Sequence, residues 1–189
     1  HESINSNLKA DFSSINGIRH LQLAYLDSMR LMPRTTSAPV TATKAPLNPS
    51  RSGIEVTCDG PFKFDFYRNL AAFRDNVKVK QLDPSGDNLT CQKLDLFFTD
   101  LADETVAPRE TEMLKSDFEL REIIAAGSPA ILSAHSQKSR IQGEYLRYDL
   151  ENNNVEARSI GQQVEILQGP NRFVSQHLNY ELSENDSLG

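Results

Sequence analysis

Histidine is the side chain in this sequence that most readily takes part in catalysis or metal binding. Three internal histidines, His20, His135 and His177, are far apart in the chain. None of them has a cysteine, serine or aspartate at a spacing typical of a nucleophile or a metal site. No glycine-rich phosphate loop, zinc pattern or calcium loop is present either. We therefore expect no metal site and no cofactor.

Two pairs of carboxylates have spacings that acid–base catalysis could use. They are Asp59 with Asp65, and Asp149 with Glu151. Two side chains on a strand share a face only at even separation, and acids in solvated hairpins are far commoner than catalytic pairs. The chain also lacks tryptophan, which usually forms the sugar platforms of polysaccharide-active β-jellyrolls. We expect no catalytic residue, and no enzyme.

The two cysteines, Cys58 and Cys91, are too few for a metal site or a disulfide-rich scaffold. Each lies within a strand-like pattern. A free, buried thiol at each position is the favoured interpretation, and a disulfide between them is the alternative.

Charge and length narrow the function classes. The chain has 189 residues and a net charge of −6, with 20 basic against 26 acidic residues. Because binding to phosphates needs a basic surface and no lysine or arginine cluster occurs, we expect no nucleic-acid partner. No run of apolar residues is long enough to span a membrane, and the first residues, HESINSNLKA, do not have the pattern of a signal peptide.

The first part of the chain divides into two segments. In residues 1–32 the apolar residues of INGIRHLQLAYLDSMRLM fall mostly on odd positions, which favours strands. We interpret this segment as the end of a preceding β unit. Residues 33–52 contain four prolines among threonine, serine and alanine, which predicts a loop or linker.

From residue 53 onward the pattern predicts strands. The run PFKFDF places three phenylalanines on one face, and the segments LAAFRDNVKVKQL and LTCQKLDLFF alternate around the predicted turn DPSGDN. Residues 101–117 form a polar insert, predicted as a loop with a short helix over 110–117 as the alternative. Residues 118–134 predict two strands around Gly127, Ser128 and Pro129, with an amphipathic helix as the competing interpretation.

An internal repeat links the two strand-rich parts. Asp149 in RYDLENNNVEA follows Asp65 in KFDFYRNLAAF by 84 residues. The same offset relates Phe64 to Tyr148, Asn69 to Asn153, Leu89 to Phe173, Leu94 to Leu178, and Leu96 to Tyr180. Between these positions the offset becomes 87, which relates Val77 and Val79 to Val164 and Ile166. The sequence therefore predicts two units in one continuous β domain, residues 53–100 and 118–189.

The two units resemble the OstA-like repeat of lipopolysaccharide-transport proteins. The resemblance rests on GPFKFDFYRNLAAFRDNVKVKQLDPSGDNLTCQKLDLFF and GEYLRYDLENNNVEARSIGQQVEILQGPNRFVSQHLNYEL. It implies an all-β fold, an open antiparallel β-jellyroll with few or no helices, located in the periplasm. In that family the apolar interior holds the acyl chains of lipid A, and modules join end to end through their edge strands to bridge the periplasm. The inserts at 33–50 and 101–117 depart from single-module members of the family.

The alternating apolar residues are the candidates for a lipid-binding interior. In the first unit they are Phe62, Phe64, Phe66, Phe73, Val77, Val79, Leu94, Leu96 and Phe98. In the second unit they are Leu146, Tyr148, Leu150, Val155, Val164, Ile166, Leu178 and Tyr180. The competing interpretation is that these side chains simply fill an ordinary core.

Two functions follow from these patterns. The first is a non-catalytic module that binds lipopolysaccharide or a similar amphiphilic glycolipid and pairs with other OstA-like modules through edge strands. The alternative is a structural or adhesive β-module of the cell envelope with a filled core and no ligand. The two differ in whether the interior is open.

Overall fold

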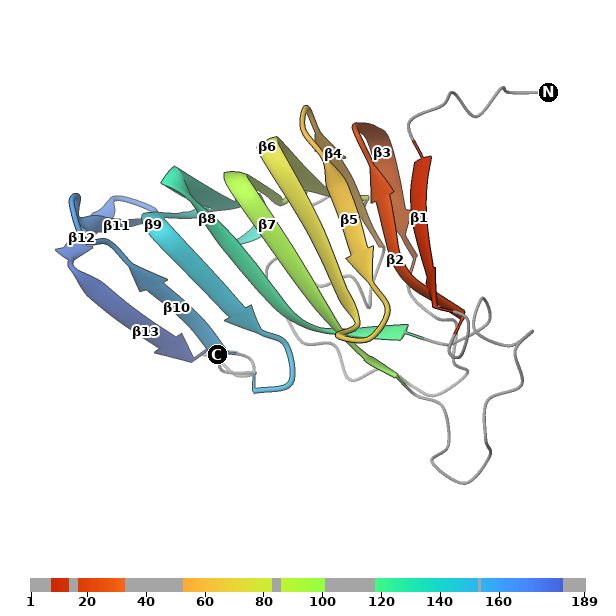
Figure 1. Cartoon of the computed structure of the whole chain (residues 1–189). Helices are drawn as coiled ribbons and strands as arrows, with labels where there is room; N and C mark the ends of the chain where they lie inside the picture. The colour runs from red at the N-terminus through yellow and green to blue at the C-terminus, as the bar shows by residue number, and fades with distance from the viewer. Residues whose placement is uncertain are drawn as a thin grey trace.

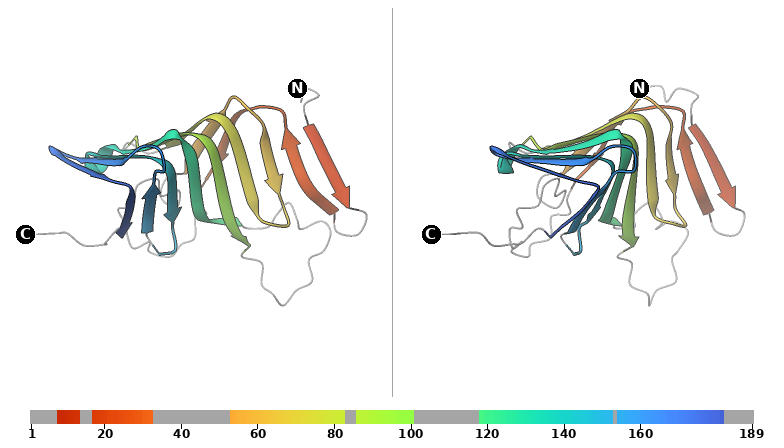
Figure 2. Two further views of the ribbon diagram at one scale, coloured as in Figure 1. Left: turned by 60° about the vertical axis from the view of Figure 1, so that its left-hand side comes forward. Right: turned by 90° about the vertical axis from the view of Figure 1, so that its left-hand side faces the viewer.

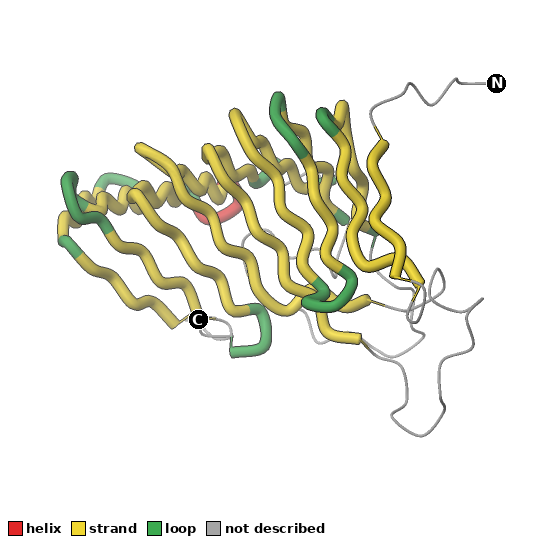
Figure 3. The backbone as a smooth tube through the Cα atoms, in the orientation of Figure 1, coloured by secondary structure: helices red, strands yellow, loops and turns green. Residues whose placement is uncertain are grey.

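A computed structural model describes residues 8–13, 17–32, 53–82, 86–100, 118–152 and 154–181 (Figure 1). The strands are β1 (Leu8–Ser13), β2 (Gly17–Leu23), β3 (Leu26–Leu31), β4 (Ile54–Cys58), β5 (Phe62–Asp65), β6 (Leu70–Gln81), β7 (Asn88–Asp100), β8 (Phe118–Ala134), β9 (Ser139–Asp149), β10 (Asn154–Arg158), β11 (Val164–Gln168), β12 (Asn171–Ser175) and β13 (His177–Glu181). A three-residue 3-10 turn, η2 (His135–Gln137), joins β8 to β9 and is the short red segment in Figure 3. The prediction of an all-β fold is confirmed.

All strands belong to one antiparallel, open sheet that folds over on itself. The main path runs β1-β2-β5-β6-β7-β8-β9-β10-β13, while β3 and β4 join the second half of β6, and β11 and β12 join the first half of β9. The long strands β6 to β9 therefore take part in two layers. Viewed from its end, the sheet shows two layers that meet along one side and diverge on the other (Figure 2). This is the open β-jellyroll that the resemblance to the OstA-like repeat implies.

Irregular backbone marks the line where the long strands pass from one layer to the other. The pairing register shifts between Arg74 and Val77 in β6, between Thr90 and Lys93 in β7, and between Ala126 and Ala130 in β8. In β6 the bend places Asp75 and Asn76 at positive φ, 63° and 48°. A β-bulge bends its strand and increases the local twist, so these positions fold the sheet.

The strand register reproduces the repeat. In the first hairpin Phe64 pairs with Ala71, and 84 residues later Tyr148 pairs with Val155. The neighbouring strands follow the same offset, because Leu94 pairs with Phe73 as Leu178 pairs with Ala157. The second offset, 87, relates Val79 to Ile166, and their partners Leu89 and Phe173 keep the offset of 84. Only β6 is continuous, whereas the second unit has separate strands β10 and β11 at the corresponding place.

Apolar side chains form rows that cross the sheet from strand to strand. One row of the second layer consists of Met29, Val56, Val79, Leu89, Leu132, Ile141, Ile166 and Phe173. A facing row of the first layer consists of Leu21, Phe64, Ala71, Leu96, Ile123, Tyr148 and Val155. Because every second residue of a strand faces the same side, these rows turn the alternation of the sequence into one apolar interior.

One strand prediction was wrong. Residues 118–134 form the single strand β8 and not two strands, and they do not form the alternative helix. The irregularity around Gly127 and Pro129 is a bulge within the strand, which the neighbouring strands β7 and β9 hold in register on both sides. The strands predicted for INGIRHLQLAYLDSMRLM are present as β2 and β3, and β1 precedes that stretch. The predictions for 33–52 and 101–117 lie outside the described residues.

Candidate functional site

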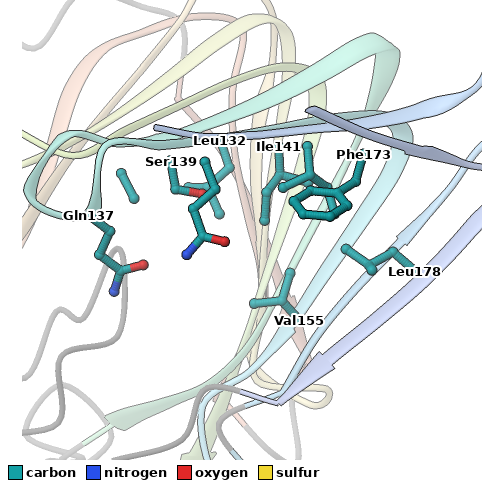
Figure 4. Close-up of a pocket in the computed structure, with 10 residues that line it drawn as sticks. Leu132, Gln137, Ser139, Ile141, Val155, Phe173 and Leu178 are labelled. Carbon is teal, nitrogen blue, oxygen red and sulfur yellow. The ribbon is translucent and has the colours of Figure 1, made fainter. Parts of the chain in front are cut away.

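The space between the two layers opens into a cavity at the C-terminal end of the sheet (Figure 4). The cavity has a volume of about 290 Å³. Its lining comprises Leu132, Ala134, Gln137, Ser139, Ile141, Val155, Ile166, Gln168, Phe173 and Leu178. None of these ten side chains is ionisable, and seven are apolar. In Figure 4 the amide of Gln137 lies on the opposite side of the cavity from Phe173 and Leu178.

Strand register explains how residues so far apart in the chain line one cavity. Ile141 of β9 pairs with Leu132 of β8 on one side and with Ile166 of β11 on the other. Two residues away on the same strand, Ser139 pairs with Ala134 of β8 and with Gln168 of β11. These two rows form one wall, and Val155 and Leu178 of the first layer contribute to the other.

Exposure along the apolar row of the second layer shows where the interior opens. Val79 is 1% exposed and Leu89 is 3% exposed, whereas Ile166 is half-buried and Phe173 is 52% exposed. These are the equivalent positions of the two units. In the first unit β8 continues the sheet beyond β7, whereas β12 pairs only with β11 among the described strands. The cavity therefore lies where the interior rows reach the end of the sheet.

Beyond this cavity the interior narrows. A void of about 20 Å³ shares Leu132 and Val155 with the cavity and extends toward Leu89. Further along, the core of the first unit is closed, since Phe73 and Leu94 have no exposed surface and the side chains around them are buried. The described structure therefore has a terminal cavity backed by a packed core, and not a continuous open slot.

The predicted interior residues divide into two groups. Side chains that are buried in the core are Phe62, Phe64, Phe73, Val77, Val79, Leu94, Leu96, Phe98, Leu146, Tyr148, Val155 and Val164. Half-buried side chains that pack against this core are Phe66, Leu150, Ile166 and Leu178. The side chain of Tyr180 lies outside the described part of the structure.

Of these predicted residues, three line the cavity: Val155, Ile166 and Leu178. Leu146 and Tyr148 line the smaller void, and burial raises the pKa of Tyr148. The other predicted side chains that the structure describes lie in or against the packed core.

Sequence reasoning missed seven of the cavity residues. They are Leu132, Ala134, Gln137, Ser139, Ile141, Gln168 and Phe173. The alternation of Ala130, Leu132 and Ala134 in β8 could have indicated that Leu132 and Ala134 face the interior. Phe173 could have been found as the repeat equivalent of Leu89. The three polar residues carried no recognisable pattern.

Glu144 of β9 holds the segment between β10 and β11. Its carboxylate accepts hydrogen bonds from the backbone N–H groups of Ile160, at 2.8 Å, and Gly161, at 3.1 Å. The hydroxyl of Ser159 in turn accepts a bond from the backbone N–H of Glu144 at 3.0 Å. These contacts fix the place where the second unit has three more residues than the first.

Two of the histidines and two of the carboxylates considered for chemistry, His20, His177, Asp65 and Asp149, have structural partners. The His20 ring lies 3.3 Å from the Asp65 carboxylate, which also accepts hydrogen bonds from the backbone N–H groups of Tyr67 and Arg68. Desolvation raises the pKa of Asp65, but the Arg68 N–H, the charge of His20 and the Tyr67 N–H together outweigh it and lower the pKa.

Asp149, the equivalent of Asp65 in the second unit, also has a lowered pKa. Desolvation raises the pKa of Asp149, and hydrogen bonds from the Asn152 side chain and backbone N–H outweigh it, so the pKa is lowered. Asp65 and Asp149 therefore hold equivalent turns. His177 pairs with Glu156 at 3.0 Å on an exposed part of the surface. Among the described residues no group of three or more potential metal ligands occurs.

Both thiols are free and buried, as the favoured interpretation of the sequence held. Thr57 pairs with Lys78 and Cys91 pairs with Val77, so Cys58 and Cys91 lie on either side of one strand. Two strand spacings separate their Cα atoms by about 9.6 Å, which exceeds the roughly 7 Å limit for a disulfide. Burial raises the pKa of Cys91 to about 12.

Comparison with known proteins supports the fold. No family model matches the chain, and no curated protein sequence matches it. Among solved structures it is similar to the crystal structure of LptH, the LptA-homologous periplasmic component of the lipopolysaccharide transport device of Pseudomonas aeruginosa. The TM-score is 0.51 at 19% sequence identity, over 69% of this chain and 77% of LptH. At this identity the similarity shows a shared fold.

In the described part of the chain, no helix has the length and apolarity needed to cross a membrane.

Proposed function

We propose that this protein is a non-catalytic, periplasmic lipid-binding module of a lipopolysaccharide-transport system. The observation that carries the proposal is the uncharged cavity at the C-terminal end of the sheet, in a fold similar to that of LptH. Lipopolysaccharide or a similar amphiphilic glycolipid is the proposed ligand. The cavity receives hydrocarbon, while the head group stays in solvent.

Burial of hydrocarbon supplies the driving force for binding. Each methylene moved from water into an apolar site contributes about 0.8 kcal/mol. Half-exposed Phe173 and half-buried Ile166 and Leu178 lose further contact with water when a chain covers them. A net charge of −6 opposes close approach of an anionic head group, which is consistent with leaving that group outside the cavity.

The two ends of the sheet suit the proposed association of modules. Among the described strands, β1 and β3 form one end, and β12 and β13 form the other, at opposite sides of Figure 1. An edge strand presents unpaired backbone N–H and C=O groups that can extend a sheet into a neighbouring chain. In the proposed bridge, the cavity end of one module faces the N-terminal end of the next.

A matched pair of substitutions on β13 tests the proposal. Leu178→Trp places a large ring at the cavity wall, whereas Asn179→Trp adds the same ring to an exposed position one residue along. Binding is measured by displacement of a hydrophobic fluorescent dye with lipopolysaccharide and with lauric acid esters. We expect Leu178→Trp to weaken binding at least several-fold and Asn179→Trp to leave it unchanged.

The alternative function, a structural or adhesive module of the cell envelope, has one observation in its favour. The core of the first unit is packed shut around Phe73 and Leu94. If no lipid displaces the dye from the unsubstituted protein, this alternative replaces the proposed function.

A further inference from the structure

The cavity has a polar end as well as an apolar one. Ser139 of β9 and Gln168 of β11 are direct cross-strand partners, and Gln137 approaches from the 3-10 turn that precedes β9. The cavity residues of the next row inward are all apolar: Leu132, Ile141, Ile166 and Phe173. Successive rows of one face lie about 6.8 Å apart, so polarity changes within a single step along the strands.

The polar end offers hydrogen bonds without charge. Glutamine amides donate through their NH₂ groups and accept through their carbonyls, and the serine hydroxyl does both. The nearest cations along the chain, Lys138 and Arg140, flank Ser139, and both are exposed and absent from the lining. At this end Gln168 is exposed, whereas Gln137 and Ser139 are half-buried. A carboxylate or phosphate held against the half-buried side chains would lose part of its hydration without gaining a charged partner in the lining, which is unfavourable.

The ion pairs near the cavity face away from it. Arg172 of β12 pairs with Glu165 of β11, and Gln142 donates to the same Glu165 at 2.7 Å. These residues alternate with the lining residues Phe173, Ile166 and Ile141 along their strands, so they belong to the outer face. Their charges already have partners on that face and do not supply a cation to the cavity.

The volume restricts the amount of hydrocarbon. At about 290 Å³ the cavity lies at the lower end of the range of roughly 300–1,000 Å³ usual for small-molecule sites. It is about twice the engineered 150 Å³ cavity that holds one benzene. The void behind it adds only about 20 Å³. A bundle of several acyl chains does not fit this space.

We propose that the cavity binds one hydrocarbon chain at a time, through a lipid whose polar group next to the chain is an uncharged ester or amide. This inference rests on the proposed function and specifies the ligand of its site. Ser139 and Gln168 hold the carbonyl of that group, Gln137 lies beside it, and the chain extends over Ile141 toward Val155. The site therefore selects for the linkage that joins an acyl chain to its head group, and against a free acid.

A series of ligands with the same chain separates this inference from the proposed function. Lauramide and monolaurin are uncharged, laurate is anionic and dodecyltrimethylammonium is cationic. Dissociation constants come from dye displacement below the critical micelle concentration, and native mass spectrometry counts the ligands bound. We expect both uncharged ligands to bind roughly tenfold or more tightly than either ion, at one chain per protein.

Variants test the polar end directly. Gln168→Leu removes the amide without changing the apolar row, and Gln162→Leu makes the same change at an exposed loop position. The readout is the ratio of the laurate and lauramide dissociation constants within one variant, which a general loss of folding does not mimic. We expect Gln168→Leu to reduce that ratio severalfold and Gln162→Leu to preserve it.

Each outcome has a distinct meaning. Laurate binding as tightly as lauramide, two or more chains per protein, or an unchanged ratio in Gln168→Leu would overturn this inference and leave the proposed function standing. Failure of every ligand to displace the dye would overturn both.

Discussion

Truncating the same residue at equivalent positions of the two units distinguishes a packed core from a binding site. Leu94 and Leu178 are 84 residues apart and pair with equivalent neighbours, Phe73 and Ala157. Leu94 has no exposed surface, whereas Leu178 is half-buried and lines the cavity. We predict that Leu94→Ala destabilises the protein far more than Leu178→Ala does.

The burial of each leucine determines how much its truncation lowers the free energy of unfolding. A fully buried leucine replaced by alanine loses its transfer free energy and leaves a void, which costs about 3–5 kcal/mol. Leu178 already borders a cavity and keeps contact with solvent, so its truncation creates no new enclosed void. Full burial of a leucine side chain contributes about 1.5–3 kcal/mol. Because Leu178 is only half-buried, Leu178→Ala loses only part of this contribution, about 1 kcal/mol. The expected difference is therefore about 2–4 kcal/mol.

Urea unfolding measures this difference. A shift in midpoint at constant m-value reports stability alone. Ligand affinity provides the second readout, because Leu178→Ala removes part of the cavity wall and Leu94→Ala does not touch it. Equal destabilisation by the two substitutions, or a loss of lipid affinity in Leu94→Ala alone, would refute the distinction between the units.

Three further predictions concern the thiols, a glycine and the turn carboxylates. Cys58 and Cys91 stay reduced under oxidising conditions and react with a thiol reagent only after unfolding, which mass spectrometry detects; a disulfide would contradict their strand positions. Gly60→Ala destabilises by about 2 kcal/mol in urea melts, because a Cβ there would lie 2.3 Å from the Asp75 carboxylate. Asp65 has a lowered folded pKa, so its contribution to stability is present above its unfolded pKa and is lost as pH falls through the folded pKa. Urea midpoints measured across the acid range should therefore depend less on pH in Asp65→Asn, and an unchanged pH dependence would exclude this role.

Strand periodicity predicts the all-β class, and the resemblance to the OstA-like repeat supplies the open jellyroll form. Every second residue faces the interior, and a repeat offset read from the sequence implies that a pair of residues in one unit recurs at that offset in the other. The pairing of Phe64 with Ala71 and of Tyr148 with Val155 follows from that rule. The predicted interior residues are accordingly buried in, or packed against, one core wherever their side chains are described.

Whether an interior position is filled or open depends on its neighbours in space. Leu94 and Leu178 are the same residue type at the same place in the repeat, yet only Leu178 borders a cavity. The difference arises because the described sheet ends at β12 and β13, while β8 and β9 continue it beyond the first unit. A pattern within one unit contains no information about the strands beside it.

The polar residues of the cavity could not be predicted for a related reason. Gln137, Ser139 and Gln168 come from a turn and two strand ends, and only the pairing of β8 with β9 and of β11 with β9 brings them together.

The wrong prediction of two strands in residues 118–134 had a local cause. Gly127 and Pro129 are strong breakers in sequence, but pairing on both sides of β8 keeps the strand continuous around a bulge.

Methyl NMR with a bound lipid tests the central claim most directly. Monolaurin is titrated into protein labelled at isoleucine, leucine and valine methyl groups. The account predicts intermolecular NOEs from the acyl chain to Val155, Ile166 and Leu178, and none to their first-unit counterparts Val79 and Leu94. Contacts to Val79 and Leu94, or the absence of any NOE to the cavity methyl groups under saturating lipid, would contradict it.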